Sequence, residues 1–451
     1  MLWVLPWLGL GAQAGPAIDG GAKVSATARV STYGCTSAPT SCEWLSFNDA
    51  AVVSPWVSAR PNAQVSARAA LDLRLHGAAS GHGLDASTQQ LPWSLRLRDA
   101  WVSARSPHTE LRLGVQRIAW GEAQGISVVD TINPLNLEDP TRLDQRLSIL
   151  AASFTAHTET LSFTAVAVPF FVPAALPTVQ VDLMADAEDL FDERFTGGET
   201  MELGSLEARP DVPNNGLSDA ALAARLRWTP RFADFGLSWH AGRDSLPQVA
   251  GDVGLLGYQT KSNRVDVGVP LAYPRQHTYG FTTRTALPAD ITAWIEAALT
   301  MPQRTVARPQ ASQLEALETL GAIDDVPRPI PETETQDGEP ITRWVIGLDR
   351  PFGPVRLVGQ WLHGFFTERR QADLRDYALV GIRWTLTPAL RLDANTATDI
   401  DGHMTDVGLT VLHGDHAEIT IATTQIRGSA DSTLSGLSAA SNVRTQFAMQ
   451  F

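Results

Sequence analysis

The chain ends with S-N-V-R-T-Q-F-A-M-Q-F, residues Ser441 to Phe451, and this stretch decides the fold. The odd positions from Val443 onward carry mostly apolar side chains, whereas the even positions from Asn442 to Gln450 carry mostly polar ones. Because the side chains of a strand alternate with a period of two, one face is apolar and the other polar. Such a strand suits a wall that separates lipid from water.

The same alternation recurs elsewhere in the chain. Residues 71–76 read L-D-L-R-L-H, residues 390–395 read L-R-L-D-A-N, and residues 406–411 read D-V-G-L-T-V. Four tryptophans lie near the ends of the predicted strands, where aromatic belts meet a membrane interface: Trp93, Trp228, Trp344 and Trp384. A soluble β-helix or propeller would show an internal repeat of fixed period, and the sequence has none.

Tight connections allow the strands to be counted. Eight of them can be read from the sequence, and most contain Pro, Gly, Asn or Asp: 60–62, 106–108, 158, 229–232, 287–290, 350–354, 387–388 and 413–415. Runs of about 9–14 residues flank each one, the length of a tilted transmembrane strand. Eight hairpins and one strand at each end, 23–33 and 441–451, give eighteen. The sequence therefore predicts an all-β fold: a closed antiparallel transmembrane β-barrel of eighteen strands.

Short turns of such a barrel face the periplasm and long loops face the outside. Three connections are long: 169–218, 243–275 and 301–340. The first and third contain short helical periodicity, and their prolines predict extended excursions rather than packed domains. Their acidic residues are expected to be solvated surface.

The start of the chain predicts export. Residues 2–10 are apolar, and Ala12-Gln13-Ala14 is a small-x-small cleavage pattern, so we expect a signal peptide over 1–14 and the barrel domain over 15–451. The only two cysteines, Cys35 and Cys42, are expected to form a local disulfide.

Composition narrows the function. The net charge of −14 argues against a nucleic-acid partner. No G-x-S-x-G, H-E-x-x-H or paired C-x-x-C pattern occurs, so we expect no enzyme, catalytic residue, metal or cofactor. A hydrolase barrel whose serine and histidine come together from distant strands remains a third alternative.

The most distinctive segment spans residues 110–140. It contains a loop motif of six residues: Trp120, Gly121, Glu122, Asp130, Asn133 and Pro134. A strand over 111–116 breaks at the Trp-Gly-Glu stretch, and Asn-Pro makes a second turn. We expect the chain to fold inward there, with Glu122 and Asp130 as acceptors for arginines such as Arg112 or Arg117. The motif either pins the loop to the wall or builds a constriction that contacts the solute.

The pattern L-R-x-G-x-Q-x-x-x-W-G-E, followed by D-x-x-N-P, resembles a family of outer-membrane barrels known as the domain of unknown function 1302. The resemblance covers residues 111–136 and is weaker elsewhere. More distantly, the chain resembles alginate-export porins, which are eighteen-stranded and line their pore with arginines. The strand that ends at Phe451 resembles the segment read by the barrel-assembly machinery. These resemblances imply a transport barrel without an established substrate.

Alternation assigns ten arginines to the lumen: Arg68, Arg74, Arg96, Arg98, Arg112, Arg225, Arg227, Arg356, Arg391 and Arg444. On the lipid face an arginine at mid-bilayer would cost about 2–4 kcal/mol, which favours this placement. Of 35 basic residues only Lys23 and Lys261 are lysines, and arginine suits bidentate contact with carboxylate or phosphate. A GC-rich coding sequence would give the same bias, and inward acids could cancel the arginines by pairing with them.

The sequence therefore favours a transport barrel in the bacterial outer membrane: a porin- or exporter-like channel for small anionic or amphipathic solutes. Its surroundings would be outer-membrane lipid and lipopolysaccharide. A lipid-handling barrel, or an adhesive or structural surface barrel with a plugged lumen, remains the alternative.

Overall fold

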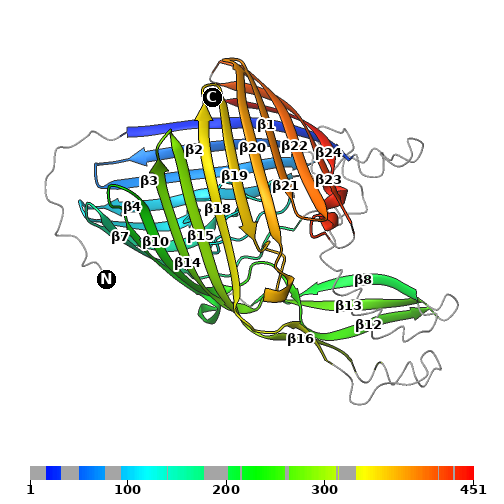
Figure 1. Ribbon diagram of the computed structural model, residues 1–451. Helices are drawn as coiled ribbons and strands as arrows, with labels where there is room; N and C mark the ends of the chain where they lie inside the picture. The colour runs from blue at the N-terminus through cyan, green and yellow to red at the C-terminus, as the bar shows by residue number, and fades with distance from the viewer. Residues whose placement is uncertain are drawn as a thin grey trace.

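The chain forms a barrel with a second sheet attached at one end (Figure 1). The computed structural model describes residues 17–31, 50–76, 93–139, 141–176, 202–213, 216–259, 264–310, 313, 332–414, 416–429 and 432–451. The barrel strands are β1 (Ala17–Ser31), β2 (Ala50–Arg60), β3 (Val65–His76), β4 (Trp93–Arg105), β5 (Thr109–Gln116), β6 (Ile149–His157), β7 (Leu161–Val168), β9 (Ala221–Trp228), β10 (Asp234–Arg243), β14 (Arg275–Leu287), β15 (Ile291–Pro302), β18 (Ile341–Phe352), β19 (Val355–His363), β20 (Asp376–Thr387), β21 (Leu390–Thr398), β22 (Gly402–His413), β23 (Ala417–Gly428) and β24 (Asn442–Gln450). Within these ranges three short 3₁₀ helices lie in loops: η2 (Leu217–Asp219), η3 (Gln371–Asp373) and η4 (Ser435–Ala440).

The barrel is closed by its first and last strands. Within the described residues eighteen strands pair antiparallel in chain order, and β1 pairs with both β2 and β24. The backbone N–H of Phe451 donates to the carbonyl of Ala22 over 2.9 Å at this seam. The predicted strand number, closure and all eight tight connections are confirmed. The first strand begins at Ala17, six residues before the predicted start.

The outer face of the wall is apolar. Residues that face each other across two antiparallel strands share a face, and Leu409 pairs with both Leu392 and Ile421. Leu409 is 40% exposed and Ile421 57%, as expected of side chains that contact lipid. In β4 the alternation changes face at a bulge opposite Ala70 and Leu71, so parity alone misassigns part of this strand.

The three long connections build a second sheet, which corrects the prediction of extended excursions. Its strands are β8 (Glu202–Pro210), β11 (Gln248–Val249), β12 (Gly251–Gln259), β13 (Arg264–Ala272), β16 (Thr305–Pro309) and β17 (Thr333–Gln336). Two of its pairings are parallel, β8 with β13 and β12 with β16, and each joins different connections. The sheet projects from the end of the barrel opposite the short turns (Figure 1).

An ion-pair cluster joins η2 to the ends of the barrel strands β10 and β14. Arg243 bonds to Asp219 over 2.7 Å, and Arg275 lies 3.3 Å from the same carboxylate. The hydrogen bonds from Arg243, together with the charges of both arginines, lower the pKa of the Asp219 carboxyl. The carboxylate therefore stays ionised and tethers η2 to the barrel.

Two expectations concern residues that lie outside the described ones. These are the signal peptide over 1–14 and the disulfide between Cys35 and Cys42. None of the helices in the described ranges is long and apolar enough to cross a bilayer.

Candidate functional site

A long connection folds into the barrel and crosses it. Residues 117–148 join β5 to β6, and we call them the lumen loop. Near one end the loop contacts Glu296 of β15 and Gln360 of β19. At residues 138 and 139, which form its tip, the loop contacts Arg74 of β3 and Arg29 of β1. Because these two groups of strands lie on nearly opposite sides of the ring, the loop spans the lumen.

One buried carboxylate fixes the loop to the far wall. Glu296 is 0% exposed, although it stands in a transmembrane strand. Its oxygens accept the backbone N–H groups of Glu122, Ala123 (2.7 Å) and Val128 (3.2 Å), and the Ser127 hydroxyl (2.8 Å). A buried charge costs free energy unless hydrogen bonds satisfy it. The loop supplies those donors, so Glu296 and the loop stabilise each other.

The predicted motif residues meet in this part of the loop. Asp130 accepts the backbone N–H groups of Trp120 (2.5 Å) and Gly121 (2.8 Å). The Asn133 side chain accepts the N–H of Ile118 over 2.8 Å and donates to the Leu147 carbonyl over 2.7 Å. The carbonyl of the next residue, Pro134, accepts the Leu147 N–H over 2.8 Å. The motif therefore folds the loop on itself.

Gly121 is required by the contact with Glu296. A Cβ atom at this position would lie 2.1 Å from the Ser127 hydroxyl oxygen and 2.8 Å from a Glu296 carboxylate oxygen. Such distances exclude any side chain unless the loop moves away from the wall.

Gly121→Ala should therefore lower the free energy of unfolding by about 1–3 kcal/mol, the usual cost of overpacking. Urea unfolding of the refolded barrel in lipid vesicles measures this loss. Gly359→Ala in β19 is the control, because a Cβ there meets nothing within 4 Å. An equal effect of both substitutions would contradict the steric argument.

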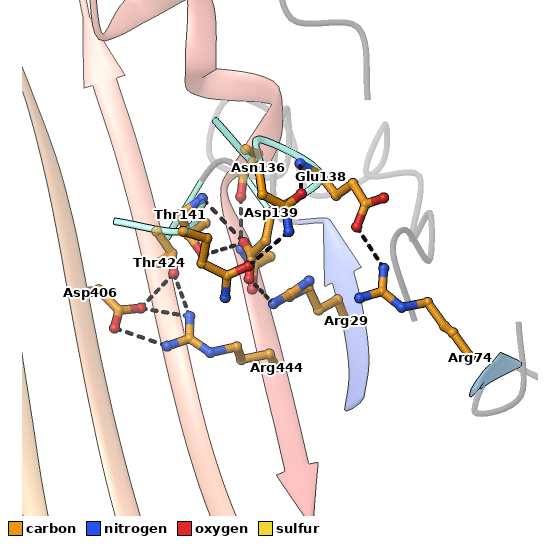
Figure 2. A network of polar contacts seen from close by, with 12 residues as sticks. Arg29, Arg74, Asn136, Glu138, Asp139, Thr141, Asp406, Thr424 and Arg444 are labelled. Atoms are coloured by element: carbon orange, nitrogen blue, oxygen red, sulfur yellow. Dashed lines mark hydrogen bonds and ion pairs between the residues drawn. The ribbon is translucent and has the colours of Figure 1, made fainter. Parts of the chain in front are cut away.

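The tip of the loop carries two carboxylates that pair with wall arginines (Figure 2). Asp139 pairs with Arg29, and both side chains are about nine-tenths buried. Glu138 pairs with Arg74 of β3 over 2.8 Å and with Arg96 of β4 through both carboxylate oxygens. These pairs attach the tip to the wall near the seam.

The expected partners of Glu122 and Asp130 were wrong. Glu122 lies 3.6 Å from Arg225 and 3.5 Å from Arg284, on strands β9 and β14. Arg112 pairs instead with Glu110 over 2.8 Å, close to the short turn that precedes β5. The loop leaves β5 at its opposite end, which carries Glu122 away from Arg112.

Each of the ten predicted arginines has a carboxylate partner in the structure. The pairs are Arg68–Asp99, Arg74–Glu138, Arg96–Glu138, Arg98–Asp72, Arg112–Glu110, Arg225–Glu122, Arg227–Asp234, Arg356–Asp349, Arg391–Asp393 and Arg444–Asp406. Wall acids and loop acids thus neutralise these strand arginines to a large extent.

Two cavities flank the tip of the loop. The first lumen cavity, of about 620 Å³, lies against β1 to β4 and is lined by eight basic and five acidic side chains. The second lumen cavity, of about 500 Å³, lies against β19 to β22 and β24, with five basic and three acidic side chains. The lining of each cavity therefore has a positive net charge, although the net charge of the whole chain is −14. The two cavities share four residues: Arg29, Arg142, Asp144 and Gln446.

The loop adds as many acidic as basic side chains to each cavity, but three of its arginines have no carboxylate partner in the described part of the chain. Arg117, Arg142 and Arg146 line the first cavity, and none forms an ion pair with a carboxylate of the described residues. Sequence reasoning missed Arg142 and Arg146, because an irregular loop has no alternation that would reveal them. It also missed Arg29 and Glu296, for which parity within β1 and β15 was an available signal.

Comparisons with known proteins agree with this architecture. The model of a family described as "Protein of unknown function (DUF1302)" matches residues 58–308, more than half of the chain. The chain belongs to the DUF1302 family. The match includes the lumen-loop motif and the strands from β3 to β15. A comparison with curated proteins finds no match.

Solved structures of outer-membrane porins share the fold of this DUF1302 barrel. OccK9 (OpdG) of Pseudomonas aeruginosa is 11% identical, with a TM-score of 0.52, over 96% of this chain and 97% of the other. OccAB1 of Acinetobacter baumannii is 10% identical, with a TM-score of 0.50, over 96% of each chain. At such identities the likeness concerns the fold alone.

The apolar outer surface of the DUF1302 barrel indicates the cell compartment in which the protein is located. A closed antiparallel barrel with an apolar exterior satisfies every backbone group of its wall and exposes apolar side chains to lipid. This is the architecture of proteins in the bacterial outer membrane, and the chain is located there.

Proposed function

We propose that the barrel is a channel for small anionic solutes, and that the lumen loop forms its constriction. The observation that carries the proposal is the positive excess of both lumen cavities in an acidic protein. Rings of basic side chains favour anions in a pore. The three loop arginines without a carboxylate partner add to this preference where the loop narrows the lumen.

The second lumen cavity supports solutes that also have an apolar part. Its lining combines Arg356 and Arg383 with apolar side chains of the wall, Leu379 and Met404, and of the loop, Leu143. An amphipathic carboxylate can place its charge near a guanidinium and its apolar part against these side chains. Solutes without an apolar part fit the first cavity, whose lining is more polar.

Single-channel recording of the refolded protein in a planar bilayer under a salt gradient tests the proposal. The wild-type reversal potential should show anion preference, and Arg142→Gln should reduce it because Arg142 lines both cavities. Two unit charges 4 Å apart interact by about 4 kcal/mol at an effective dielectric constant near 20, so one arginine at a constriction has a measurable effect.

Arg308→Gln in the second sheet removes the same charge outside the barrel and is the control. It should leave the reversal potential unchanged. A wild-type channel without anion preference would contradict the proposal, and a barrel that never conducts would favour a surface protein with a plugged lumen.

A further inference from the structure

The carboxylate of Glu138 is held as a bound solute would be held. Arg96 approaches it with two nitrogens, one on each oxygen, and Arg74 donates to one of these oxygens from the neighbouring strand. Bidentate contact of this kind is the geometry by which arginine recognises free carboxylates. The two guanidiniums therefore form a complete carboxylate cradle on the wall.

This cradle opens onto the first lumen cavity. The side chain of Arg96 is 40% exposed, that of Arg74 24% and that of Glu138 23%. Because all three side chains are partly exposed, water in the cavity reaches both the arginines and the carboxylate. A carboxylate that enters the cavity can therefore compete for the same arginines.

The position of Glu138 in the chain also distinguishes it from the other acids of this cavity. Asp72 belongs to a wall strand, and its carboxylate accepts hydrogen bonds from both Arg98 and the Ser54 hydroxyl of the neighbouring strand. Glu138 belongs to the tip of the lumen loop, beyond the part that Glu296 and Asp130 fix. Its neighbour Asp139 pairs with Arg29 in a buried contact that keeps the tip in place.

We propose that Arg74 and Arg96 form a carboxylate-binding subsite for the transported solute, and that Glu138 fills this subsite as an internal competitor. The inference rests on the proposed anion channel and names one of its binding sites. When a solute carboxylate binds the two arginines, the Glu138 carboxylate turns into the cavity water. Competition reduces the apparent affinity of the solute to the intrinsic affinity multiplied by the fraction of time that Glu138 leaves the cradle free. Weak binding suits a channel, which has to release what it binds.

The test compares two variants that each remove one negative charge from the same cavity. Glu138→Gln empties the cradle, whereas Asp72→Asn leaves Glu138 on Arg74 and Arg96. The measured quantity is the benzoate concentration that halves the chloride current through single channels. Glu138→Gln should lower it about fivefold, equivalent to about 1 kcal/mol.

Asp72→Asn should leave the half-blocking concentration close to that of the wild type. Adding Arg96→Gln to Glu138→Gln should restore the half-blocking concentration of the wild type, because the bidentate partner of the benzoate carboxylate is lost. If the half-blocking concentration falls equally in Glu138→Gln and Asp72→Asn, net charge alone explains the effect and the inference is overturned. The inference is also overturned if this concentration does not fall in Glu138→Gln. A wild-type channel without anion preference would instead overturn the proposed function, and the comparison of the variants would still measure benzoate binding at the cradle.

Discussion

Replacing Glu296 by alanine is expected to release residues 121–128 from the far wall and to increase the single-channel conductance. Alanine removes an acceptor of three backbone N–H groups and one hydroxyl, and the donors at this buried position are left unsatisfied. Each buried donor left without an acceptor costs about 1–3 kcal/mol. Summed over these donors, the cost corresponds to a shift of more than about a hundredfold toward the released loop.

Two further variants separate this effect from general damage. Glu296→Gln keeps the size of the side chain and one carbonyl oxygen, so its conductance should lie between those of the wild type and Glu296→Ala. Thr300→Val changes another inward residue of β15 that bonds only weakly to Thr278, over 3.4 Å, and it should conduct like the wild type. If Glu296→Ala folds and conducts like Thr300→Val, the carboxylate does not hold the loop.

Ala394→Arg is expected to destabilise the barrel by about 2–4 kcal/mol, the cost of arginine on the lipid face at mid-bilayer. Ala394 lies in the middle of β21 and faces lipid, because it pairs with Ile382 and Val407, both exposed on the outer surface. Urea unfolding in vesicles of a defined lipid measures the loss, and reduced refolding yield should accompany it.

The adjacent residue provides a matched control. Asn395 faces the lumen, where it pairs with Gly381 and Asp406 and lines the second cavity. Asn395→Arg should leave the free energy of unfolding within about 0.5 kcal/mol of the wild type, as for a tolerated exposed position. A similar loss in both variants would mean that the predicted lipid and lumen faces are not distinct.

The barrel wall could be predicted because its determinants are local. Each strand carries its own alternation, and each short turn carries its own turn-forming residues, as in 229–232 and 387–388. The bulge in β4 marks the limit of this reasoning, since one extra residue exchanges the two faces. The second sheet could not be predicted, because β8 and β13 pair in parallel across a long sequence separation.

The lumen loop shows a similar division. Parity assigned Arg74 and Arg96 to the inner face, and in the structure both contact the loop inside the barrel. Their partner Glu138 was not predicted, because the path of an irregular loop depends on contacts with strands distant in sequence. The break at Trp120 was recognisable, but its anchor is Glu296 on β15, six strands away from β5 around the ring.

The seam between β1 and β24 has a consequence for the order of folding. The pairing of Ala22 with Phe451 joins almost the two ends of the described chain, so the ring is the last part of the wall to be completed. Until then two strand edges with unpaired backbone groups are exposed, which favours misassembly. The lumen loop joins β5 to β6 at the open end of the barrel, so it reaches the lumen through the mouth. Its tip contacts Arg29 on β1, so the enclosed loop itself occupies one side of the edge that β24 finally joins.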